Sequence, residues 1–266
     1  MRRAFRVAYD GTAYRGFQRQ PHAETVENDL FRALAALGVT PDPQVPPDGY
    51  AAAGRTDAGV SARAQTVSLD CPEWLSPVAL NSELPADVRA WASADVAETF
   101  HAQYDARSRR YRYFLHAPDA DDSRVQDALD RLAGSHDFHN LTPDETGTER
   151  DLRTGFERDG EFLVCTFEAG GFPRSFVRRA VRLVEWVASG ERDSEFVGRV
   201  LGFEPVTGAD SFGAAPPEPL VLDSVAYPVR FERDEQAVAS LASVFGRRRV
   251  ERQTGARVAD RLTRTD

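Results

Sequence analysis

The chain has 266 residues, of which 41% are hydrophobic and 28% charged, and it carries a net charge of −9. This balance excludes an intrinsically disordered chain, and no apolar run approaches the roughly 20 residues that a membrane span needs. The N-terminus, MRRAFRVAYDG, lacks the apolar stretch of a signal peptide, so the sequence predicts a cytoplasmic protein without a membrane partner.

The first part of the chain alternates between strand and helix patterns. A helical stripe over residues 25–37 has Thr25 as its expected N-cap and Gly38 as its stop. Residues 77–84 form a second, shorter helix pattern. Strand patterns occupy residues 5–10, 51–53, 62–69 and 88–96. The order is therefore β-α-β-β-α-β, and we expect residues 1–105 to form the N-terminal half.

The second part is predicted to have a similar order, with Asp159-Gly160 as the turn of a hairpin. Strand patterns occupy residues 110–116, 152–158, 161–167 and 220–229, and helix patterns occupy residues 125–132 and 173–188. We expect residues 106–232 to form the C-terminal half, followed by an arginine-rich helical extension at residues 233–266. Together the halves predict an α+β body with a mixed, largely antiparallel sheet and a cleft between the halves.

All 33 cationic positions are arginine, and the sequence contains neither lysine nor isoleucine. The two missing residue types fit a G+C-rich coding bias. The acidic excess and the missing lysine together predict a protein adapted to high salt. A negative net charge does not exclude an RNA partner, because a local basic patch decides nucleic-acid binding.

Neither a disulfide nor a metal site is expected. Cys71 and Cys165 lie far apart in the sequence, which is typical of buried thiols in a reducing compartment. His136 and His139 form an HxxH pair, but further ligands at matched spacing are missing. We interpret both histidines as loop or surface residues.

The segment GRTDAG at residues 54–59 is the strongest local signal of function. Glycines flank Arg-Thr-Asp, which is typical of a strained loop that holds one side chain rigidly in a cleft. An aspartate near a glycine is also common in ordinary turns, where its carboxylate bonds its own backbone. The pattern alone therefore leaves both a catalytic Asp57 and a turn residue open.

Three further segments accompany GRTDAG, and the four follow one another as YDGTAYRGFQRQP, AGRTDAGVSA, FHAQYDARSRRYRYFL and FPRSFVRRAVRLV. In this order they resemble the TruA family of tRNA pseudouridine synthases, and the similarity extends from Phe5 to Pro228. The resemblance implies the pseudouridine synthase fold and a homodimer without a cofactor. It also implies that the partner is tRNA, modified at uridines 38 to 40 of the anticodon stem-loop.

The resemblance assigns roles to four residues. Asp57 matches the nucleophilic aspartate and Arg178 the helix arginine that pairs with it, which would keep the carboxylate ionised. Tyr111 matches the substrate-contacting tyrosine, whose ring would stack on the base and whose hydroxyl would carry a proton. Arg55 matches the arginine that would hold the flipped nucleotide or fill the space it leaves.

Without the resemblance, these residues have ordinary alternatives. Tyr111 lies in an alternating strand, where a core aromatic is typical, and Arg178 would be an exposed helix charge. Arg174, Arg178 and Arg182 are spaced to form one basic helix face. The arginines and tyrosines at residues 104–113 fit an RNA-binding cluster or a solvated edge strand. The C-terminal arginines fit RNA, a partner subunit or solvent.

The chain departs from the family pattern at six positions. The usual residues, in chain order, are Trp, His, His, His, Asn and Gly, and here they are Phe17, Ser61, Arg174, Ser175, Arg179 and Arg182. We expect none of the six to touch Asp57, Tyr111 or Arg178. We expect these departures to affect which uridines are modified and how the protein contacts RNA.

Three other functions remain open from the sequence. The first is a noncatalytic RNA-binding relative, against which the retained Asp57, Tyr111 and Arg178 argue. The second is a pseudouridine synthase that acts at other RNA positions. The third is a hydrolase with Asp57 as its nucleophile, but that chemistry expects a second carboxylate and a nucleophile elbow that the sequence lacks.

Overall fold

A computed structural model describes residues 1–264 of the chain, and its strands form one mixed sheet. In chain order the strands are β1 (Arg2–Tyr9), β2 (Ala51–Ala52), β3 (Ser61–Asp70), β4 (Val88–Asp95), β5 (Ser108–His116), β6 (Gly134–Asp137), β7 (Glu149–Asp159), β8 (Phe162–Ala169), β9 (Leu220–Ala226) and β10 (Glu232–Arg233). Their order across the sheet is β10-β4-β1-β3-β9-β5-β8-β7-β6, and β2 also pairs with β3. The predicted strands are confirmed, with ends that shift by a few residues.

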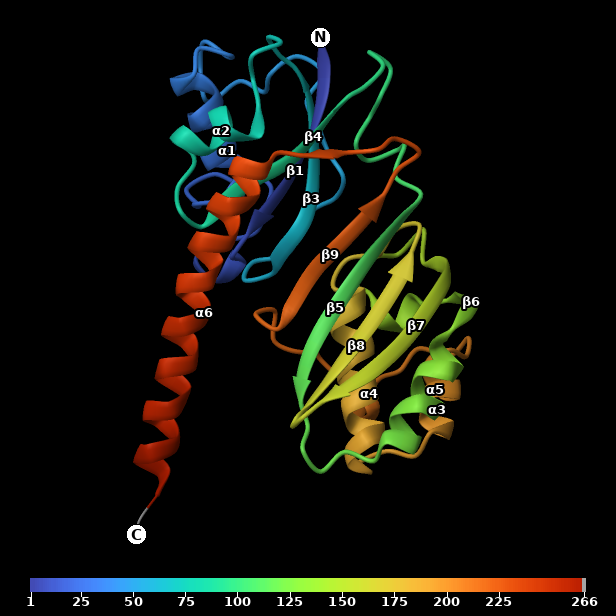
Figure 1. Cartoon of the computed structure of the whole chain (residues 1–266). Coiled ribbons are helices and arrows are strands. Elements are labelled where there is room, and N and C mark those ends of the chain that lie inside the picture. Colours follow the sequence, from blue (N-terminus) through green and yellow to red (C-terminus); the bar gives the residue numbers. More distant parts are fainter. Residues whose placement is uncertain (265–266) are drawn as a thin grey trace.

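The two halves of the sheet meet where β3 lies beside β9. This pair is parallel and short, with Ser61 opposite Val221 and Ala62 opposite Leu222. The other named strand pairs are antiparallel, which confirms a mixed, largely antiparallel sheet. Figure 1 shows β1, β3 and β4 at one end of the molecule and β5, β7 and β8 at the other. The loop that carries Asp57 enters β3 at this junction.

Two helices complete the first half, α1 (Val26–Ala36) and α2 (Pro77–Glu83). Thr25 caps α1 as predicted, because its side chain accepts a hydrogen bond from the backbone N–H of Asn28. The apolar stripe of α1, including Leu30 and Leu34, is buried against the strands in one hydrophobic core. The local sequence signals therefore predict this half well.

The second half has a core of its own. Helices α3 (Asp122–Leu132), α4 (Phe176–Ser189) and α5 (Glu195–Val200) lie behind β5, β7 and β8 in Figure 1. The apolar face of α4 is buried, including Val177, Val181 and Val184. Tyr111 of β5 packs against both this core and the core of the first half, so it lies where the two halves meet.

Several sequence expectations for the second half are wrong in detail. Helix α4 begins at Phe176 instead of residue 173, because Ser175 has a left-handed backbone that no right-handed helix includes. Arg174 therefore precedes α4 and does not share a helix face with Arg178 and Arg182. Strand β5 lies between β9 and β8, so it is not a solvated edge strand. Strand β6 and helix α5 were not predicted, because both are short.

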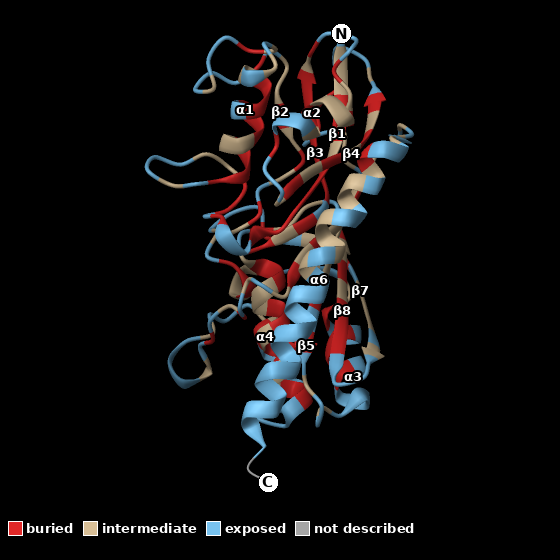
Figure 2. Cartoon of the chain, turned by 60° about the vertical axis from the view of Figure 1, so that its left-hand side comes forward, coloured by how far each residue is buried: buried red, intermediate tan, exposed pale blue. Residues whose placement is uncertain are grey.

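The C-terminal extension forms the predicted helix, α6 (Glu235–Thr263). Its first turns contact β4 and α2, whereas every described residue from Val250 onward is exposed. Figure 2 shows this exposed part projecting beside the second half. Among residues 1–264, no helix is both long and apolar enough to cross a membrane.

Candidate active site

The loop at residues 54–60 is fixed by hydrogen bonds to β1, to the turn that follows β1, and to β3. Thr56 is buried, and its hydroxyl lies 2.7 Å from the Tyr9 hydroxyl. The Thr56 carbonyl accepts a hydrogen bond from the Phe17 N–H at 3.1 Å. Gln65 of β3 donates its side-chain amide to the Gly54 carbonyl at 2.8 Å. These contacts hold the backbone on both sides of Asp57 and explain why YDGTAYRGFQ and GRTDAG serve one site.

Two glycines permit this close packing. Gly16 has a φ of +103°, and a Cβ there would lie 2.9 Å from the Thr56 carbonyl oxygen. Gly59 has a φ of +82°, and a Cβ there would lie 2.9 Å from a ring carbon of Pro217. Positive φ favours glycine, and a side chain would in addition collide at both positions. The loop therefore needs these glycines for its shape.

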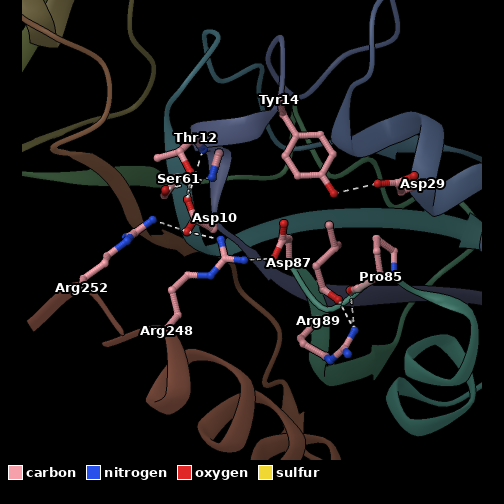
Figure 3. A network of polar contacts seen from close by, with 12 residues as sticks. Asp10, Thr12, Tyr14, Asp29, Ser61, Pro85, Asp87, Arg89, Arg248 and Arg252 are labelled. Atoms are coloured by element: carbon pink, nitrogen blue, oxygen red, sulfur yellow. Dashed lines mark hydrogen bonds and ion pairs between the residues drawn. The ribbon is translucent and has the colours of Figure 1, made fainter. Parts of the chain in front are cut away.

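The turn before the loop is also tied to the C-terminal helix. Asp10 is buried at the end of β1 and accepts hydrogen bonds from Thr12 and from Arg248 and Arg252 of α6 (Figure 3). The N–H of the adjacent Gly11 donates a hydrogen bond at 3.0 Å to the hydroxyl of Ser61, which is the first residue of β3 after the loop. Hydrogen bonds therefore connect α6 to the turn after β1, and that turn to the start of β3, directly after the Asp57 loop.

Asp57 meets two residues from the start of α4. The Arg178 guanidinium Nη1 and the Ser175 Oγ each lie 3.2 Å from Asp57 Oδ2. Among residues 1–264, no group donates a hydrogen bond to the other oxygen, Oδ1. The Asp57 side chain is 36% exposed and that of Arg178 is 19% exposed. One carboxylate oxygen is therefore held by donors while the other is available to a ligand.

Arg178 is itself fixed by the chain that follows α5. Its Nε donates to the Ala215 carbonyl at 2.7 Å, and the Ala215 N–H donates to the Arg178 carbonyl at 3.0 Å. The planar guanidinium therefore donates one hydrogen bond to the Ala215 carbonyl and another, from a different nitrogen, to the Asp57 carboxylate. The Arg178–Asp57 pair expected from the resemblance is present in the structure.

Tyr111 lines the same cavity, with its ring in an edge contact with Phe172 at 5.2 Å between centroids. Burial raises the pKa of the Tyr111 phenol to about 12, although the charge of Arg109 opposes this shift and that of Asp57 adds to it. The phenol is therefore protonated at neutral pH and can donate a hydrogen bond. No hydrogen bond joins Tyr111 to Asp57 in the described chain.

The cavity has a volume of about 1030 Å³ and lies between the two halves. Its walls come from residues 50–60 of the first half, residues 101–111, and residues 170–178 of the second half. Arg55 lies exposed on this wall, and its guanidinium has no hydrogen-bond or ion-pair partner among residues 1–264. It is therefore free to bind a ligand. No group of three or more metal-binding side chains occurs in the part of the chain that the structure describes.

Two cavity-wall residues belong to the arginine and tyrosine set at residues 104–113, for which the sequence predicted RNA binding or solvent exposure but no place in the active-site cavity. Arg109 donates to the carbonyls of Ala53, Gln103 and Gly170, so it joins three walls of the cavity. Tyr104 is exposed at the cavity and stacks on His101 at 4.3 Å. Only the strand alternation around Tyr111 could have indicated that Arg109 faces this side.

Two expectations about neighbouring residues need correction. Ser175 was expected to stay away from Asp57, but its hydroxyl bonds Oδ2, because the left-handed turn directs it there. The arginines near Tyr111 do not form one cluster either. Arg110 pairs with Glu168, and Arg112 pairs with Glu157 and Asp223, because alternate residues of β5 face opposite sides of the sheet.

Comparison with known proteins identifies the family. A family model described as tRNA pseudouridine synthase matches residues 128–228. A protein of Natronomonas pharaonis named tRNA pseudouridine synthase A is 60% identical over 264 residues, which cover 98% of each chain. The chain belongs to the tRNA pseudouridine synthase family. The synthase is therefore an isomerase that converts uridine to pseudouridine, and its α+β architecture is the pseudouridine synthase fold.

Other relatives agree with this assignment. The proteins of the same name from Haloarcula marismortui and Halobacterium salinarum are 58% and 52% identical, each over 98% of both chains. These relatives come from halophilic archaea, which fits the acidic, lysine-free composition. A chain from the crystal structure of a Cbf5-Nop10-Gar1 complex aligns with 67% of this chain at 11% identity, but its TM-score of 0.28 supports no conclusion.

Proposed function

We propose that the synthase modifies uridines 38 to 40 in the anticodon stem-loop of tRNA, with Asp57 as the nucleophile. The supporting observation is the asymmetry of the Asp57 carboxylate, in which Oδ2 accepts from Arg178 and Ser175 while Oδ1 accepts from no residue of the described chain. The cavity volume of about 1030 Å³ is at the upper end of the range, roughly 300–1,000 Å³, that encloses small ligands. A nucleotide turned out of its stack fits such a space.

The reaction moves one base without any change in oxidation state. The bond between N1 of uracil and C1′ of the ribose breaks, and a bond between C5 and C1′ forms. C5 loses a proton and N1 gains one, so atoms balance within the nucleotide. Asp57 takes part either by covalent addition or by proton abstraction that yields a glycal, and both routes need an ionised carboxylate beside the sugar and base.

The surrounding residues have complementary roles in this proposal. Arg178 holds one oxygen of Asp57 and so orients the other. The Tyr111 ring packs against the uracil, and its neutral hydroxyl is suited to carry the proton between ring positions. Arg55 binds the phosphate of the extruded nucleotide or occupies the space that it leaves. The exposed Tyr104 ring adds a surface on which a neighbouring base stacks.

A mapping experiment tests both the position and the nucleophile. The synthase is incubated in molar salt with an unmodified tRNA transcript, and pseudouridine is mapped by carbodiimide reactivity. We expect product at positions 38 to 40 with the wild type and none with Asp57→Ala or Asp57→Asn, while RNA binding remains. Asp159→Asn is the matched control, because Asp159 also lies within two residues of a glycine at a turn but outside the cavity.

Each other outcome has a defined meaning. Product at other uridines would leave Asp57 as the nucleophile but move the substrate site. Tight binding without product by the wild type would indicate an RNA-binding relative without activity on this substrate. Turnover by Asp57→Ala would exclude the nucleophile assignment.

We further infer that the synthase is a cytoplasmic homodimer, so that one tRNA contacts both subunits. The family resemblance supports the dimer, and the exposed outer part of α6 offers surface for a partner. Light scattering at several salt concentrations tests it, and a monomer mass throughout would exclude it.

A further inference from the structure

Ser175 has a backbone conformation that its residue type disfavours. Its φ of +57° and ψ of +8° lie in the left-handed region, where among residues 1–264 only one other non-glycine residue, His22, has a positive φ. A side chain in this region crowds its own carbonyl group, so non-glycine residues adopt it at a cost. Such a residue persists only where its surroundings determine the conformation.

The surroundings of Ser175 do determine it. The preceding residue, Arg174, is held on both sides of its Cα. Its N–H donates to the Asp144 carboxylate at 2.8 Å, and its carbonyl accepts from the Thr142 hydroxyl at 3.0 Å. The Ser175 carbonyl accepts the first hydrogen bond of α4, from the Arg179 N–H at 3.1 Å. The turn is therefore built into the structure and is not a loose end of the helix.

The Ser175 side chain does not do what an N-cap serine normally does. A serine at this position usually accepts a hydrogen bond from the first turn of its own helix, from an extended backbone. Four other N-cap residues of this chain behave in that way: Thr25, Ser76, Asp121 and Asp234. Ser175 makes no such bond, and its hydroxyl instead donates to Asp57 Oδ2 at 3.2 Å.

We propose that Ser175 is a positioning residue for Asp57, and that the left-handed turn exists to deliver its hydroxyl to Oδ2. Arg178 contacts the same oxygen at 3.2 Å, from a point one turn further along α4. Two donors on Oδ2 prevent the carboxylate from rotating about its terminal bond, so Oδ1 keeps one orientation toward the substrate. The inference rests on the proposed role of Asp57.

The alternative is a serine that only shapes the turn, and substitutions separate the two readings. Glycine accepts a φ of +57° without strain but removes the hydroxyl. Threonine keeps the hydroxyl but is more strained, because its side chain branches at Cβ. For a positioning residue, activity therefore depends on the hydroxyl and not on stability: glycine lowers activity without lowering stability, and threonine lowers stability but retains activity. For a residue that only shapes the turn, loss of the hydroxyl leaves activity unchanged.

The experiment measures kcat, KM and the thermal midpoint of Ser175→Gly, Ser175→Ala and Ser175→Thr with an unmodified tRNA transcript at constant salt. We expect Ser175→Gly to melt at or about 2 °C above the wild type. Its kcat falls about tenfold to a hundredfold, because a hydrogen bond to a charged group is lost, while KM stays within about twofold. Ser175→Ala loses kcat to the same extent, without the gain in midpoint. Ser175→Thr keeps kcat within about threefold and melts below the wild type.

His22→Gly is the matched control. It removes the other positive-φ side chain, which is exposed and lies outside the cavity, so its midpoint changes as in Ser175→Gly while kcat does not. A wild-type kcat for both Ser175→Gly and Ser175→Ala overturns the inference. If Asp57→Ala also turns over, the proposed nucleophile fails as well; if it does not, only the role of Ser175 fails.

Discussion

A buried carboxylate links α6 to the body of the synthase. The Asp10 side chain is 3% exposed and accepts hydrogen bonds from Arg248 and Arg252, which come from α6, and from Thr12 (Figure 3). Arg248 also pairs with Asp87 beside β4. We predict that Arg248→Met lowers the free energy of unfolding, because it removes the better buried of the two cations that neutralise Asp10.

The magnitude follows from what remains in the variant. Breaking a buried ion pair costs about 3–5 kcal/mol, whereas an exposed pair contributes about 0–1 kcal/mol. In Arg248→Met, the Asp10 carboxylate keeps Thr12 and the largely exposed Arg252, so it is not left alone. We therefore expect a loss of about 2 kcal/mol at neutral pH, between the two limits.

The difference in unfolding free energy between the wild type and Arg248→Met depends on pH, and the environment of Asp10 determines in which direction. Burial alone would raise the pKa of this carboxyl, but hydrogen bonds from Arg248 and Thr12 and the charge of Arg252 together lower it. The unfolded pKa is about 3.9, so the stability from this site is fully present above that pH. It disappears as pH falls through the lower, folded pKa. The gap between wild type and Arg248→Met should therefore narrow below about pH 4.

Urea unfolding, followed by tryptophan fluorescence at fixed salt, measures both effects. The wild type and Arg248→Met are compared at pH 7 and again at pH 3.5. Arg249→Met is the matched control, because Arg249 is exposed and has no hydrogen-bond or ion-pair partner among residues 1–264. The reasoning would be refuted if both variants lost the same free energy of unfolding. It would also be refuted if the difference between the wild type and Arg248→Met were the same at both pH values.

Two further predictions concern the cavity. Arg178→Lys keeps the charge, but a lysine cannot reach Asp57 and the Ala215 carbonyl together. We therefore expect kcat to fall about tenfold or more. The control, Arg182→Lys on the next turn of α4, leaves kcat unchanged. Equal rates for both lysine variants would contradict this. Tyr111→Phe should bind RNA normally and turn over about a hundredfold more slowly if its hydroxyl carries a proton. Because the pKa of Tyr111 is about 12, the wild-type rate should show no decline from this group below about pH 11.

The parts of the fold that depend on nearby residues could be predicted from the sequence. The Thr25 cap, the buried stripe of α4 and the hairpin after Asp159 each follow from residues within a few positions of one another. Strand β6 and helix α5 escaped prediction because a segment of four to six residues has too few positions to establish a period.

The candidate site could be predicted only through the family resemblance. Asp57 and Arg178 are 121 residues apart, and no periodicity or spacing indicates that they meet. The Ser175 contact was missed altogether, because the predicted helix over residues 173–188 included Ser175 and gave no sign of a left-handed turn at that residue. The clamp on Arg174 by Thr142 and Asp144, which produces the left-handed turn, is itself a long-range contact.

The arginines around the cavity differ in whether they build the site or are available to bind RNA. Arg109 is bonded to three carbonyls and Arg178 to Asp57 and Ala215, so both build the site and have little left to offer a phosphate. Arg55 is exposed and unpaired in the described chain, so it can bind a phosphate without breaking an internal contact. In concentrated salt, phosphate contacts contribute less to affinity, and stacking on the aromatic rings that line the cavity has to contribute more. We therefore expect the shape of the site, more than the net charge of the chain, to determine which uridine this synthase selects.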